Sequence, residues 1–123
     1  MPSLPARRAL SLACLLALPL GACIAGGTDT SAGRASELAT TVSRATACNA
    51  GRPQRGTLDR FLASEKARGA SEDQIAAARS AYVSVSEAET INQGIRPEPC
   101  TAKERGQLKE RMGRIRGGNF DAS

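Results

Sequence analysis

Apolar residues from residue 35 onward recur at steps of three and four, the spacing that places them on one face of an α-helix. The first such stripe predicts a helix over residues 35–47, and its members are Ala35, Leu38, Val42 and Ala45. Glycine and proline interrupt the pattern at residues 49–56, which indicates a loop. A second stripe of Leu58, Phe61 and Leu62 predicts a second helix that ends before Gly69. Thr57 is the expected cap of that helix, because a threonine oxygen can accept a free backbone N–H.

Two further helices are predicted by capping boxes, in which a serine or threonine is followed three residues later by Glu or Gln. The first box, Ser71 to Gln74, opens a predicted helix over residues 72–93. Its apolar stripe consists of Ile75, Ala78, Tyr82 and Val85. Prolines at 97 and 99 then impose an extended segment. The second box, Thr101 to Glu104, opens a helix to about residue 116, whose stripe is Leu108, Met112 and Ile115.

The apolar run near the N-terminus has a different character. Arg7 and Arg8 precede an apolar stretch of 12 residues, residues 9–20. A membrane-spanning helix needs about 20 apolar residues, so this run is too short, and Pro19 interrupts its last turn. A charged segment followed by a short apolar one predicts a cleaved secretory signal.

Residues 20–23, Leu-Gly-Ala-Cys, resemble the lipobox of bacterial lipoproteins, in which an aliphatic residue and two small residues precede cysteine. The resemblance covers residues 1–23 only. It implies cleavage after Ala22, a diacylglycerol on the Cys23 thiol and fatty acylation of the new amine. Two or three acyl chains hold a protein stably in a bilayer. The alternative is an ordinary signal peptide cleaved after Ala22 or Ala25, in which Cys23 has no special role.

The same resemblance implies a place in the bacterial envelope. Ile24 stands where an aspartate retains enterobacterial lipoproteins in the inner membrane, so the expected location is the outer membrane, facing the periplasm. Residues 23–34 are small and polar and predict a flexible tether between the lipid and a domain over residues 35–120.

The cysteine count fits this picture. Cys14 leaves with the signal and Cys23 is acylated, so Cys48 and Cys100 remain in an oxidising compartment, where thiols generally pair. Such a disulfide closes a loop of about 50 residues and, by restricting the unfolded chain, stabilises the fold by about 4 kcal/mol. Free thiols are the alternative. A zinc site is disfavoured because zinc needs four ligands and the chain has no histidine.

Composition supports a small all-α fold that depends on such a crosslink. The chain has 123 residues, enough for one domain, and its aromatic residues are only Phe61, Tyr82 and Phe120. Alanine is abundant, which favours helix but buries little area. The expected fold is an array of about four short helices, tied by a disulfide, with Phe120 folding back onto the core.

No catalytic constellation emerges from the sequence. Without histidine, the commonest general base is missing. Ser64 and Lys66 lie two apart on a predicted helix and face different ways. Neither of the carboxylate pairs, Glu72 with Asp73 and Glu87 with Glu89, has a partner that the sequence can identify. We therefore expect a binding or structural module that has no enzymatic activity, no cofactor and no metal site.

The fourth predicted helix suggests an anion-binding site. The chain carries a formal net charge of +5, and three basic residues cluster on one flank of this helix: Arg105, Lys109 and Arg116. Expected partners are lipid or lipopolysaccharide phosphates, or an acidic envelope protein. A solvated helix with charged flanks is the simpler interpretation. Nucleic acid is a poor candidate, because aromatic stacking residues are scarce.

Overall fold

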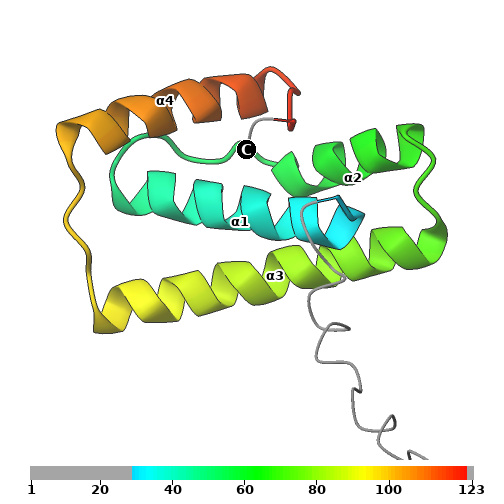
Figure 1. Ribbon diagram of the computed structural model, residues 1–123, viewed down its shortest axis with the longest axis horizontal. Coiled ribbons are helices and arrows are strands. Elements are labelled where there is room, and N and C mark those ends of the chain that lie inside the picture. Colours follow the sequence, from blue (N-terminus) through cyan, green and yellow to red (C-terminus); the bar gives the residue numbers. More distant parts are fainter. Residues whose placement is uncertain (1–28, 122–123) are drawn as a thin grey trace, which may run out of the picture.

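The computed structural model describes residues 29–121, which form four α-helices and no strand (Figure 1). The helices are α1 (Ser31–Ala47), α2 (Thr57–Ala67), α3 (Glu72–Ile95) and α4 (Ala102–Arg116). The predicted all-α array is confirmed. The predicted signal, the lipidation site Cys23 and the first half of the predicted tether lie outside the described residues.

Helix α1 lies at the centre, with α3 along one side and α4 along the other (Figure 1). Helix α2 packs against the first part of α3, so the two form a hairpin. The predicted apolar stripes converge on one core, whose largest fully buried side chains include Phe61, Leu38, Met112 and Ile115. Phe120 does fold back, and its ring meets Phe61 edge to face at 5.6 Å between centroids.

The start of α1 corrects the prediction. The tether was expected to reach residue 34, but Ser31 to Arg34 already belong to the helix, which Thr30 caps by accepting the N–H of Gly33 at 2.9 Å. Contacts distant in sequence hold this extra turn. Ser31 Oγ and the Arg34 guanidinium both donate to the carboxylate of Glu65 in α2, whose side chain is only 2 % exposed.

The predicted cap of α2 is wrong. Gly56, not Thr57, occupies the N-cap position, with a left-handed φ of 75°. Thr57 is the first helical residue, and its hydroxyl donates to the carbonyl of Gln54 at 2.8 Å. Glycine adopts this backbone conformation without steric cost. The loop therefore turns into α2 through Gly56, and the hydrogen bond from Thr57 holds the end of the loop against the first turn of the helix.

Both capping boxes begin helices, but they differ in detail. At α3 the box is complete, because Ser71 accepts the N–H of Gln74 and the Gln74 side chain accepts the N–H of Ser71. At α4 Thr101 accepts the N–H of Glu104, whereas the Glu104 carboxylate accepts two hydrogen bonds from Arg44 of α1. Arg44 is the main reason that the pKa of Glu104 lies below its usual range. The second box therefore also joins α4 to α1.

The disulfide between Cys48 and Cys100 is present, as predicted, with its Cα atoms 5.7 Å apart. Cys48 follows directly after α1, and Cys100 lies two residues before α4, so the bond fixes the end of one helix to the start of the other. In residues 29–121, no helix combines the length and the apolar character needed to cross a bilayer.

Candidate anion-binding surface

The loop between α1 and α2 packs along the predicted basic flank of α4. Gly51 sits so close to Met112 that a Cβ at position 51 would lie 3.2 Å from the Met112 side chain. Arg105 Nε donates to the carbonyl of Cys48 at 3.0 Å, and Arg116 Nη2 donates to the carbonyl of Arg52 at 3.0 Å. Two of the three predicted anion-binding residues therefore also hold the loop in place.

Helix α2 contributes a further arginine to the same place. Arg60 donates through Nη2 to the carbonyl of Arg116 and through Nη1 to Oε1 of Gln54, both at 2.9 Å. Arg60 of α2 therefore contacts the end of α4, and Arg116 of α4 contacts the loop, through side-chain to carbonyl hydrogen bonds. These bonds bring the end of α4 and the loop against the first turn of α2.

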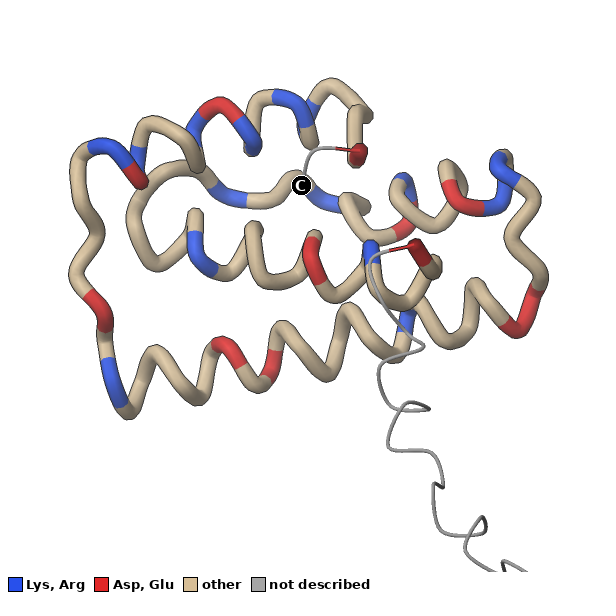
Figure 2. The backbone as a smooth tube through the Cα atoms, viewed as in Figure 1, with Lys and Arg blue, Asp and Glu red and all other residues tan. Residues whose placement is uncertain are grey.

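The loop and the flank together form one basic surface, which we call the basic cluster. Its members come from the loop, from α2 and from α4, and are Arg52, Arg55, Arg60, Arg105, Lys109 and Arg116. All are exposed except Arg60, which is half-buried. Figure 2 shows basic positions on the loop directly alongside those of α4. Sequence periodicity pointed only to the α4 members, because nothing in it shows that the loop lies on that flank.

The charge of the basic cluster is not neutralised by ion pairs. The described residues form five ion pairs, and their cations are Arg34, Arg44, Lys66, Arg68 and Arg79. None of them belongs to the cluster, in which Arg60, Arg105 and Arg116 are hydrogen-bonded to carbonyl and amide oxygens instead. A guanidinium bound to a neutral oxygen keeps its full charge and has donors to spare. The cluster is therefore equipped to bind anions.

The opposite side of the molecule has the opposite charge. Helix α3 carries four carboxylates and a single arginine, Arg79, which pairs with Asp59 of α2 at 3.1 Å. Helix α4, across α1, carries six basic and two acidic residues. The domain is therefore electrostatically polarised, with the basic cluster at one side and α3 at the other (Figure 2).

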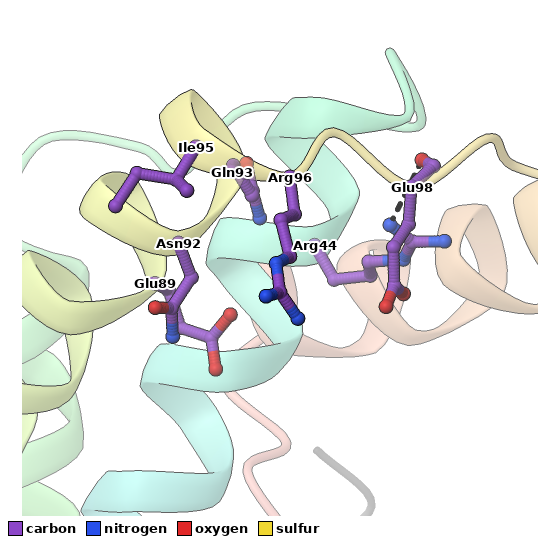
Figure 3. A pocket seen from close by; sticks show the side chains of 7 residues that line it. All are labelled: Arg44, Glu89, Asn92, Gln93, Ile95, Arg96 and Glu98. Carbon is purple, nitrogen blue, oxygen red and sulfur yellow. Dashed lines mark hydrogen bonds between the residues drawn. The ribbon is translucent and has the colours of Figure 1, made fainter.

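A second feature is a polar cleft of about 510 Å³ between the C-terminal ends of α1 and α3 (Figure 3). Its walls include Arg44, Glu89, Asn92 and Arg96, and the Arg96 guanidinium points into it (Figure 3). Arg44 is already bonded to Glu104 and to the two backbone carbonyls of residues 98 and 99. Because its walls mix both signs of charge, this cleft is a weaker candidate for an anion than the basic cluster.

The disulfide region brings together three groups that bind metals in other proteins. Ligand atoms of Cys48, Cys100 and Glu104 all lie within 4.8 Å of one another. Both sulfurs, however, are bonded to each other, and the Glu104 carboxylate is bound by Arg44. Thiolates are the form of cysteine that binds metal, so the oxidised protein offers no metal site here.

Comparisons with models of protein families, with curated proteins and with solved structures give no match for this chain.

Proposed function

We propose that this chain is a non-enzymatic binding module of the bacterial envelope, anchored by an acylated Cys23, whose basic cluster binds phosphate-bearing lipid or lipopolysaccharide surfaces. The observation that carries the proposal is the basic cluster itself, in which six cations share one surface with no ion-paired carboxylate among the described residues. Each Lys or Arg close to an anionic membrane contributes about 1 kcal/mol to binding.

Lipid anchoring and anion binding support each other in this proposal. Acyl chains would keep the domain within a short tether of a bilayer, where the local concentration of lipid phosphates is high. Even a weak electrostatic contact would then orient the domain with the basic cluster towards the bilayer. The same orientation would turn the acidic helix α3 away from the bilayer.

The anion-binding test uses the full chain with Cys23→Ser, so that any binding comes from the protein surface rather than from a lipid anchor. It should co-sediment with vesicles that contain phosphatidylglycerol but not with phosphatidylcholine vesicles, and added salt should weaken the binding. Charge reversal to glutamate at Arg52, Arg55 and Lys109 should weaken binding on the order of a hundredfold. These three positions are chosen because none of their side chains forms a hydrogen bond or ion pair among the described residues.

A matched control reverses three cations on the other flank of α4, Lys103, Arg111 and Arg114, and so produces the same net charge. It should retain most of the binding. Equal losses in the two triple variants would mean that net charge alone drives binding, and no binding at low salt would refute the proposal. Lipid anchoring is tested separately, because labelled fatty acid should be incorporated into the native chain and not into Cys23→Ser.

A further inference from the structure

Helix α3 exposes an apolar face to solvent. Three large apolar side chains are exposed in residues 29–121, and all three belong to this helix: Val83 at 45 %, Ile91 at 61 % and Ile95 at 71 %. Scattered exposed apolar residues are normal, but three on one helix form a patch.

The patch continues along one face of the helix. At 100° per residue, these side chains share a face with Glu87 and with alanine and serine residues, and every member is exposed. The members of this outer face are Asp73, Ala76, Ala77, Ser80, Val83, Ser84, Glu87, Ile91, Gly94 and Ile95. The helix has 24 residues and is therefore about 36 Å long. The outer face is long enough to hold a second helix of five or more turns.

The polarity of the second half of α3 is inverted relative to an ordinary surface helix. Glu89 and Gln93 turn towards α1 and line the polar cleft, and Gln93 donates to the carbonyl of Ser43. Ile91 lies on the solvent side. Ile95 also borders the cleft, but it is 71 % exposed, and Figure 3 shows it pointing away from Arg44. A surface helix normally places its apolar stripe towards the core and its charges towards water. Ile91 and Ile95 therefore direct most of their apolar surface to solvent rather than into the core of the domain.

The acidic residues near the outer face of α3 indicate which kind of partner can bind there. Asp73 and Glu87 lie on the outer face and Glu72 beside it. Glu72 is paired with Lys66 of α2, and the single arginine of α3 is engaged by Asp59. A second copy docking α3 against α3 would align two acidic helices with no free cation between them, which is unfavourable. The basic cluster of another copy would match in charge, but no large apolar side chain is exposed there. A helix with an apolar stripe and basic flanks matches both properties.

We infer that the outer face of α3 is a docking site for an amphipathic, basic helix of another protein. The small alanine and serine side chains of the outer face allow close approach along the first half of α3. Val83, Ile91 and Ile95 provide apolar contact along the second half. Glu87 lies within the face and receives a lysine or arginine from the partner. This site is separate from the basic cluster and does not depend on it.

The test uses the full chain with Cys23→Ser and a fluorescent synthetic peptide of leucine, alanine and lysine. The leucines form one helical face, and the lysines flank it. A control peptide has the same composition in an order that gives no apolar face. Fluorescence anisotropy should show binding of the amphipathic peptide only. The double variant Val83→Gln/Ile91→Gln should weaken the affinity for the amphipathic peptide at least about tenfold, and Glu87→Lys should weaken it several-fold. Lys103→Gln, on α4, should leave it unchanged.

Four results would overturn the inference. Equal binding of both peptides would show charge attraction without helix docking, and unchanged affinity in the double variant would place the peptide elsewhere. A concentration-dependent dimer in sedimentation that the double variant abolishes would assign the face to a second copy. Binding to phosphatidylcholine vesicles that the double variant abolishes would assign it to lipid. Circular dichroism verifies that each variant keeps its helices.

Discussion

Glu65 shows how a single buried charge can fix the start of a helix. Its carboxylate is 2 % exposed and accepts hydrogen bonds from Arg34 and from Ser31. The bonds from Arg34 are the largest reason that the pKa of Glu65 lies below its ordinary value, and they outweigh the opposing effect of burial. A buried ion pair compensates its own desolvation only when its hydrogen bonds are satisfied, as they are here.

Removing the arginine should therefore be costly. Arg34→Ala leaves Glu65 charged and buried, and we expect it to lower the free energy of unfolding by about 2–4 kcal/mol. Urea denaturation followed by circular dichroism measures this loss. The matched control is Arg79→Ala, which breaks an exposed pair with Asp59 and should cost less than about 1 kcal/mol. Equal losses in the two variants would show that burial of Glu65 adds nothing.

The same group gives the fold a defined acid sensitivity. Because the pKa of Glu65 is lower in the folded than in the unfolded state, the unfolded chain binds more protons as the pH falls below the ordinary value of 4.5. Its contribution to stability is therefore complete above that pH and is lost as the pH falls towards the folded-state pKa. Urea midpoints measured between about pH 3 and pH 7 should decline more steeply for the native chain than for Arg34→Ala. Parallel curves would contradict this assignment.

At the level of elements, local sequence patterns predicted which segments are helical but not all of their ends. The four apolar stripes and the complete cap at Ser71 followed from spacing alone, because those interactions lie within a few residues. The early start of α1 did not, since it depends on Glu65 of another helix. The bond between Glu104 and Arg44 could not be predicted from the sequence either, because the two residues lie 60 positions apart. The basic cluster was found only in part for the same reason: the loop that completes it is placed by tertiary contacts.

Replacing glycine by alanine should have opposite effects on stability in the loop and in helix α4. Gly51 has a φ of 145° and lies against Met112, so Gly51→Ala should strain the backbone, crowd α4 and cost about 1–3 kcal/mol. Gly106 lies in α4, and a Cβ there would meet no atom within 4 Å. Gly106→Ala should instead stabilise the fold by about 1 kcal/mol, the propensity difference between the two residues. Thermal denaturation should move in opposite directions for the two variants, and a shift of the same sign in both would contradict the loop packing.

At the scale of the whole molecule, α1 separates two surfaces of different chemistry. The basic cluster lies on the side of α4, and the apolar, acidic outer face belongs to α3 (Figures 1 and 2). An anionic surface would attract the first and repel the second, so under the proposed function the domain would bind a bilayer and still present α3 to a protein partner.

The disulfide links stability to this arrangement, because it joins the two segments that build most of the basic cluster. Cys48 leads directly into the loop, and Cys100 leads into α4. The double variant Cys48→Ser/Cys100→Ser should lower the free energy of unfolding by about 4 kcal/mol, the entropy of closing a loop of this length. Under conditions where its circular dichroism stays helical, its binding to anionic vesicles should also weaken, since α4 and the loop can then separate. Retention of both stability and binding would show that Arg44–Glu104 and the arginine–carbonyl bonds hold these segments together without the disulfide.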